Sequence, residues 1–130
     1  MNKFKKQERL SGDLAFVKII QNGKSYFKFP YRFVYRIING NQEYPVKVGF
    51  SVPKRNIRRA VKRNYIKRRL KEVYRLNKQR LYKHLQDYNV SIELIIIYID
   101  KKVINYREIE QTLPEYLNEL FNKIYKENCN

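Results

Sequence analysis

The chain has 130 residues, of which 29 are Lys or Arg and 12 are Asp or Glu, so its formal net charge at pH 7 is +17. Hydrophobic residues make up 43% of the chain and aromatic residues 15%, a content that supports a folded core and excludes a chain disordered over most of its length. The excess of positive charge is far beyond what solubility requires, and it favours a polyanionic partner such as a nucleic acid.

The N-terminal segment, residues 1–10, is basic, and we expect it to form a flexible arm. No apolar stretch follows it, so a signal peptide is not predicted. The longest apolar run, residues 94–99, is too short to cross a bilayer. The single cysteine, Cys129, has no partner for an internal disulfide. We therefore expect one cytoplasmic domain over residues 1–130, with no membrane partner.

A first helix is predicted directly after this arm. Ser11 is a candidate N-cap, and Gly23 is a candidate stop. Phe16 and Ile20 lie four residues apart on one face of this helix, and Ile19 adjoins them.

Two alternating segments predict β-strands. In residues 25–38, period two places a set of apolar side chains on one face: Phe29, Tyr31, Phe33, Tyr35 and Ile37. Pro30 indicates a strand edge or a bulge near the start of this segment. A turn signal at residues 39–41 precedes a second strand over residues 45–52 with its own alternating set: Val46, Val48, Phe50 and Val52. We predict that the two strands form a hairpin.

A basic helix and a further strand follow. Pro53 ends the second strand, and the helix is predicted to begin a few residues later and to run towards Leu85. Its apolar positions fall within a narrow arc that should face the sheet: Ile66, Leu70 and Val73. Residues 87–89 predict a loop. The nearly continuous apolar run at residues 91–99 predicts a strand that is central or covered on both faces.

A last helix is predicted from a cap at Asn105, with Glu108 and Glu110 in its first turns. Its apolar stripe comprises Ile109, Leu113, Leu117, Leu120, Phe121 and Ile124. Pro114 falls inside this pattern, so we expect a kink or a short break there. The predicted order is α-β-β-α-β-α, an α+β sandwich of helices on a small, mainly antiparallel sheet.

Catalytic chemistry has little support in the sequence. His84 is the single histidine, with no carboxylate cluster beside it, and Ser51 lacks the frame of a nucleophile elbow. The twelve acids are scattered, and four glycines form no phosphate-cradling loop. We therefore predict no catalytic residue, no metal site and no cofactor bound by the protein.

Phosphate-binding chemistry is abundant along the basic helix. Residues 54–75 contain eleven basic side chains and a single acid, Glu72. One side of the predicted helix carries Arg63, Asn64, Lys67, Arg68, Lys71 and Arg75, and a second flank carries Arg58, Lys62 and Arg69. Arginine forks and lysine ammonium groups neutralise backbone phosphates and release their counterions. Phe16, Phe33 and Tyr35 are candidates for stacking on unpaired bases, and the alternative is that they are core residues.

The segment from Val48 to Arg75 resembles the protein subunit of bacterial ribonuclease P. The family signature is a strand ending in G-x-S-V-x-K-K and a helix carrying A-V-x-R-N-R-I-K-R, and the chain has VGFSVPKR at residues 48–55 and AVKRNYIKRRLKE at residues 60–72. Weaker collinear matches are Arg9-Leu10, Phe16 and Gly23-Lys24-Ser25. One position departs from the pattern, because the Arg-Asn-Arg triplet is Arg63-Asn64-Tyr65 here.

The resemblance implies a specific fold. It is an α-β sandwich with a mixed, mostly antiparallel four-stranded sheet and three helices, like domain 2 of ribosomal protein S5. The long aromatic segment would then count as two strands. A left-handed β-α-β crossover is also expected from the family, against the usual hand.

The resemblance also implies a function. The holoenzyme would hydrolyse precursor tRNA to remove its 5′ leader, with catalysis in the RNA subunit and its Mg²⁺ ions, and with one protein per RNA. The implied contacts to the ribonuclease P RNA are Lys54, Arg55, Arg63, Asn64, Tyr65, Lys67, Arg68 and Lys71. The implied contacts to the leader are Phe16, Ile20, Phe33, Tyr35 and Lys67. The alternatives are a structured-RNA-binding protein, such as a ribosomal or assembly protein, and a DNA-binding factor.

Overall fold

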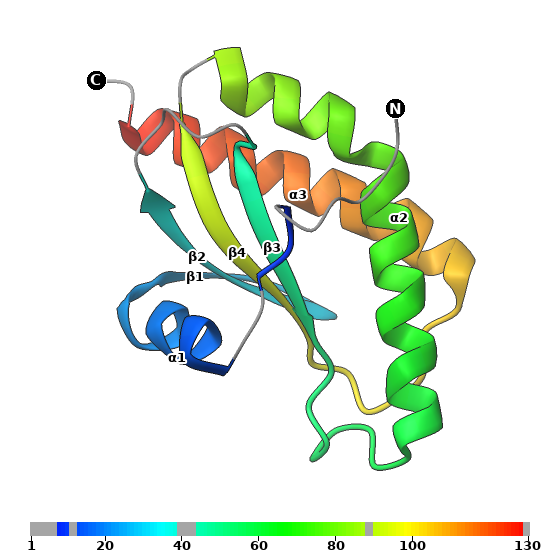
Figure 1. Cartoon of the computed structure of the whole chain (residues 1–130). Coiled ribbons are helices and arrows are strands. Elements are labelled where there is room, and N and C mark those ends of the chain that lie inside the picture. Colours follow the sequence, from blue (N-terminus) through cyan, green and yellow to red (C-terminus); the bar gives the residue numbers. More distant parts are fainter. Residues whose placement is uncertain (1–7, 11–12, 39–43, 88–89, 129–130) are drawn as a thin grey trace.

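The computed structural model describes residues 8–10, 13–38, 44–87 and 90–128. The elements in these residues (Figure 1) are α1 (Asp13–Asn22), β1 (Lys24–Lys28), β2 (Tyr31–Ile38), β3 (Val46–Ser51), α2 (Ala60–Asp87), β4 (Ser91–Tyr98) and α3 (Tyr106–Asn128). The first seven residues of the expected arm, the cap at Ser11, the turn at 39–41, residues 88–89 of the expected loop and Cys129 lie outside the described residues.

The four strands form one mixed sheet in the order β1-β2-β4-β3. The aromatic segment divides into β1 and β2, which pair antiparallel around a cis peptide bond between Phe29 and Pro30. The predicted hairpin between β2 and β3 is wrong, because β4 lies between them, antiparallel to β2 and parallel to β3. An apolar strand such as β4 is stable in the centre of a sheet, where both faces are covered. The hand of the β3-α2-β4 crossover stays a prediction.

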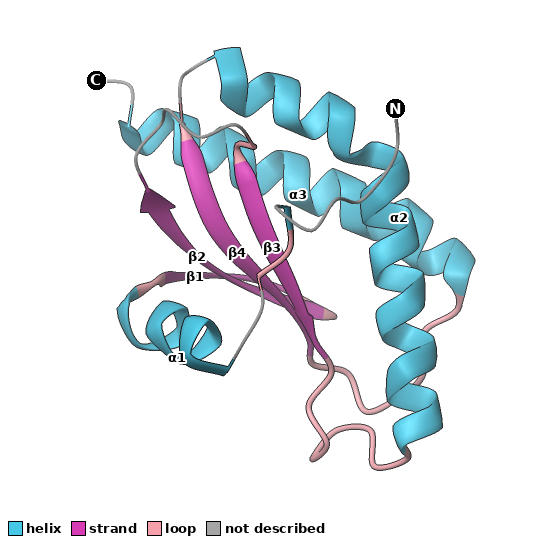
Figure 2. Ribbon diagram, in the orientation of Figure 1, coloured by secondary structure: helices cyan, strands magenta, loops and turns pink. Residues whose placement is uncertain are grey.

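The two faces of the sheet are covered by different helices (Figure 2) and carry separate clusters of buried side chains. On one face, side chains of β2, β3 and β4 form the main core with α2 and α3: Tyr31, Phe33, Tyr35, Val46, Val48, Phe50, Ile92, Leu94 and Ile96. On the other face α1 covers a smaller cluster around Ile19, Val34 and Ile95. The predicted alternation is therefore confirmed for Tyr31, Phe33 and Tyr35, which face α3. It is wrong for Phe29, which lies in the turn before β2 and is exposed.

The helices follow their sequence signals closely. α2 extends over 28 residues and buries Ile66, Leu70 and Val73 as predicted. At the start of α3, the Asn105 Oδ1 atom accepts a hydrogen bond of 2.9 Å from the Glu108 N–H, which confirms the cap. α3 continues through Pro114, so the expected break is absent from this described helix. Its apolar stripe is fully buried against the sheet and α2.

The described end of the N-terminal segment, residues 8–10, packs against β3. Arg9 forms an isolated parallel bridge with Val48, and the Leu10 N–H donates to the Val48 carbonyl over 2.9 Å. β3 is an edge strand, so these residues cover backbone groups that a free edge would expose. The Glu8 side chain is 1% exposed. The expectation of a flexible arm is therefore wrong for residues 8–10, because buried contacts and an edge bridge hold them.

Candidate nucleic-acid interface

The outward face of α2 carries the predicted cationic surface. Asn64, Lys67, Arg68 and Lys71 are spaced three or four residues apart, so they lie in one stripe on the helix. Asn64, Arg68 and Lys71 are exposed, and Lys67 is partly buried. The opposite side of α2 is anchored in the core, which fixes the direction of the stripe. We call these four residues the α2 ridge.

Among the described residues, no acid neutralises the ridge. In the parts of the chain that the structure describes, no salt bridge involves Lys67, Arg68 or Lys71, nor Lys54 and Arg55 in the turn before α2. The neighbouring Arg75 does pair, with Glu72 at 2.7 Å, and this hydrogen-bonded pairing holds the pKa of the Glu72 carboxyl below its usual value. The ridge therefore offers free positive charge to a polyanion.

Arg63, a predicted RNA contact, also makes hydrogen bonds within the protein. Its Nη1 atom donates hydrogen bonds to the carbonyl oxygens of Ile57 at 3.0 Å and Arg58 at 2.6 Å. The side chain thus ties the turn before α2 to the first turns of the helix. Two of its N–H donors are used inside the protein, and its contact to RNA stays a prediction.

Tyr65, which replaces the second arginine of the triplet, is also held within the protein. Its ring packs against the main core, and the guanidinium group of Arg69 lies over it, 4.2 Å from the ring centroid. Such a cation–π contact fixes the direction of the arginine without removing its charge. The position therefore still presents a positive group, which comes from Arg69.

The structure contradicts the predicted aromatic trough. Phe33 is 0% exposed and Tyr35 is 1% exposed, and both face α3. The Tyr35 hydroxyl donates to Glu127 of α3 at 3.2 Å. Phe16 belongs to α1 on the opposite face of the sheet, so it cannot join these two rings in one surface. Phe33 and Tyr35 are core residues, because α3 needs an apolar face of the sheet to pack on.

α1 packs mainly on β2 and β4, and Phe16 reaches β3. A Cβ atom on Gly49 would lie only 2.4 Å from Cζ of Phe16, so the missing side chain makes room for this ring. Ile19 is buried against β2 and β4, whereas Ile20 is 48% exposed. Of the predicted leader residues, the structure therefore brings Phe16 onto the sheet and leaves Ile20 at the rim. Lys67 belongs to α2, which packs on β3 and α3 rather than α1.

Sequence reasoning missed a row of side chains beside α1. The strand register aligns Phe27 of β1, Arg32 of β2, Ile97 of β4 and Ser51 of β3 across the sheet. We call these four residues the outer row. Phe27 is 65% exposed, and Arg32 and Ser51 are partly exposed. The signal was present in the alternation of β2, because it places Arg32 on the face opposite the aromatic side chains.

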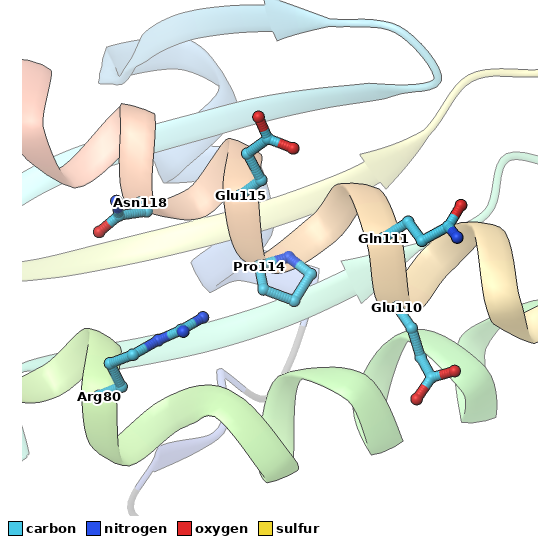
Figure 3. Close-up of a pocket in the computed structure, with 6 residues that line it drawn as sticks. All are labelled: Arg80, Glu110, Gln111, Pro114, Glu115 and Asn118. Atoms are coloured by element: carbon cyan, nitrogen blue, oxygen red, sulfur yellow. The ribbon is translucent and has the colours of Figure 1, made fainter.

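A groove elsewhere on the described residues is not suited to binding a nucleic acid. A groove of about 410 Å³ lies between α2 and α3, where Arg80 extends towards Pro114 (Figure 3) and Glu110 and Glu115 belong to the lining. Its mixed charge does not suit a polyanion.

Within the described residues, no three His, Cys, Asp or Glu side chains are grouped to hold a metal ion. None of the described helices combines the length and the apolar character that a membrane crossing needs.

Comparisons with known proteins agree on one family. The model of the family described as Ribonuclease P matches residues 4–125. The ribonuclease P protein component of Porphyromonas gingivalis is 31% identical over 112 residues, which cover 86% of this chain and 82% of that protein. The protein of the same name from Syntrophus aciditrophicus is 39% identical over 83 residues, which cover 64% of this chain and 66% of that protein.

Solved structures show the same fold. The ribonuclease P protein of Thermotoga maritima superposes with a TM-score of 0.68 at 21% identity, covering 86% of this chain and 96% of that one. The Staphylococcus aureus protein superposes with a TM-score of 0.67 at 22% identity, covering 87% and 94%. The sheet order, the charged helix and the sequence match agree with one another, and the chain belongs to the ribonuclease P protein family.

Proposed function

We propose that the chain binds the RNA subunit of ribonuclease P through the α2 ridge and the adjoining Lys54 and Arg55, and that the assembled particle removes the 5′ leader of precursor tRNA. The observation that carries this proposal is the exposed ridge without acidic partners in the described residues. In this proposal the RNA subunit and its Mg²⁺ hydrolyse the phosphodiester bond. The protein holds the two RNAs, one protein per RNA subunit, in the cytoplasm.

This proposal is tested by adding the protein to a bacterial ribonuclease P RNA and a precursor tRNA at low Mg²⁺. Two polyanions repel each other when cations are scarce, and a protein with a net charge of +17 offsets that repulsion. We expect the rate of leader cleavage to rise with protein concentration. The matched control is a variant with Lys67, Arg68 and Lys71 all replaced by Ala, which keeps most of the positive charge. Equal rates of leader cleavage with and without the protein would favour a structured-RNA-binding module. Cleavage by the protein alone would contradict the proposal that the RNA subunit hydrolyses the bond.

We further propose that the leader lies along the outer row and the adjacent ring of Phe16. The row crosses the sheet from the exposed ring of Phe27 to Ser51, and the chain continues from Ser51 into the basic turn at Lys54 and Arg55. A single strand can therefore stack on an aromatic ring while its phosphates meet Arg32 and then the turn. This combination binds unpaired RNA with little sequence preference.

The leader surface predicts a change in preference between two substrates. Replacing Phe27 with Ala is expected to reduce the affinity ratio of precursor tRNA to mature tRNA by about tenfold, because stacking on one ring contributes roughly 1–3 kcal/mol per base. Replacing Arg32 with Ala should also lower this ratio. Lys28 is the matched control, since it is the neighbouring hairpin cation but faces Tyr116 and Glu119 of α3. If Arg32→Ala and Lys28→Ala change the ratio equally, the leader does not follow this face.

A further inference from the structure

A second basic surface is a hollow at the start of α2, lined by residues that do not belong to the α2 ridge. It has a volume of about 190 Å³, and two segments distant in the sequence form it. Arg58, Arg59 and Lys62 come from the turn before α2 and its first turn, and Lys101 comes from the loop between β4 and α3. Figure 1 shows these two loops at the same end of the molecule. Val103 adds an apolar wall.

The charge of this hollow is unbalanced. Four cationic side chains line it, and no acidic residue belongs to its lining. Within the described residues none of the four forms a salt bridge, and the first turn of α2 holds no acid. The nearest acid in sequence is Asp100, whose Oδ1 atom accepts the Lys102 N–H at 3.1 Å. Four cations around one hollow repel one another, so an anion placed between them is favoured.

Both walls of the hollow are held in place. On one side Arg63 donates to the carbonyl groups of Ile57 and Arg58, which fixes the turn before α2. On the other side the Tyr98 hydroxyl donates to the Lys102 carbonyl, and Asp100 binds the Lys102 N–H. The backbone that bears Lys101 is therefore closed into a compact turn. A preorganised site loses less entropy when it binds its ligand.

We propose that this hollow is a phosphate-binding site, in which Arg58, Arg59, Lys62 and Lys101 together hold a backbone phosphate of an RNA. The inference rests on the proposed function and adds to it a contact off the ridge, made partly by the β4–α3 loop. Arg63 is then a positioning residue for this site. The phosphate comes from the RNA subunit or from the bound precursor tRNA, and the two sources share the same chemistry.

The test compares charge reversals that differ only in position. Lys101→Glu is expected to weaken RNA binding by tenfold or more. The slope of log K against log salt should become shallower by roughly 0.7–0.9, the value for one phosphate contact. Lys102→Glu is the control, because this exposed neighbour does not line the hollow. Lys62→Glu and Lys83→Glu form a second pair on α2, and only Lys62 lines the hollow. The double variant of Lys62 and Lys101 should lose less than the sum of the single losses, since both hold one phosphate.

Each variant is measured in two arms, once with a bacterial ribonuclease P RNA alone and once with precursor tRNA added to the assembled particle. A loss specific to Lys101→Glu in the first arm assigns the phosphate to the RNA subunit, and a loss confined to the second arm assigns it to the precursor. Equal effects of Lys101→Glu and Lys102→Glu in both arms would overturn the site. That result leaves the proposed function intact if the ridge variant still loses RNA binding. A ridge variant that binds RNA as tightly as the parent would refute the proposed function itself.

Discussion

Replacing Lys67, Arg68 and Lys71 together with Ala is expected to weaken binding to a bacterial ribonuclease P RNA about a hundredfold at roughly 0.1 M salt. Each phosphate contact adds about 0.7–0.9 to the slope of log K against log salt. At this salt concentration, the loss of three contacts therefore lowers log K by roughly two. The slope itself should become shallower by about two to three. A filter-binding or fluorescence titration at several salt concentrations measures both quantities. The variant should fold normally, because the three side chains lie outside the buried core of α2.

A control of equal charge separates the position of the ridge from the net charge of the protein. Lys83, Lys102 and Lys126 are exposed on α2, on the β4–α3 loop and on α3. Replacing these three with Ala removes the same number of cations from scattered sites. We expect this control to retain most of the affinity, with only a small long-range effect that disappears as salt rises. Comparable losses in both variants would mean that the ridge is not the interface.

The triplet at residues 63–65 shows why a motif alone does not define the interface. Arg63 is engaged with the turn before α2, and Tyr65 supports the guanidinium group of Arg69 from below. Thus two of the three motif residues make contacts within the protein. Arg63 holds the turn before α2, and Tyr65 holds the side chain of Arg69. Asn64 is the one member of the triplet that is exposed. Substitutions at Arg63 would therefore disturb the geometry of neighbouring cations as well as one charge.

Much of the fold followed from local sequence signals, and the errors came from non-local pairing. Helix limits and buried stripes were predictable, because caps and the 3.6-residue period are encoded within each segment. The hairpin between β2 and β3 was a wrong inference from adjacency in sequence. The segment that separates them, β4, comes some forty residues later, and only its continuous apolar character indicated a central position.

The site was predictable in its charge and not in its aromatic part. The ridge was predictable because the helical period of α2 places its apolar residues on one side and its basic residues on another. For β2, alternation shows which residues share a face but not which helix covers that face. The alternation of Phe33 and Tyr35 therefore left both stacking and the core open, and the packing of α3 decides for the core. Arg32 on the opposite face was the better indicator of an accessible surface.

A buried ion pair that sequence reasoning did not anticipate joins the N-terminal segment to α2. The Lys78 Nζ atom lies 2.7 Å and 3.0 Å from the two carboxylate oxygens of Glu8, and both side chains are almost completely buried. The Tyr82 hydroxyl donates to the same carboxylate at 2.7 Å and accepts from Tyr74 at 3.1 Å. Burial raises the pKa of both tyrosines, so their hydroxyls stay protonated. This network joins residues 8–10, and with them the edge of β3, to the middle of α2.

Replacing Lys78 with Met is expected to lower the free energy of unfolding by about 3–5 kcal/mol, because it leaves the Glu8 carboxylate buried without its cation. Replacing Glu8 with Leu in the same protein should recover part of that loss, since an apolar pair of similar size carries no uncompensated charge. Urea unfolding followed by circular dichroism measures both variants. A Lys78→Met protein as stable as the parent would show that Glu8 is not enclosed against α2. If the loss is found while the ridge retains its RNA affinity below the unfolding transition, the network acts on stability and the ridge on binding.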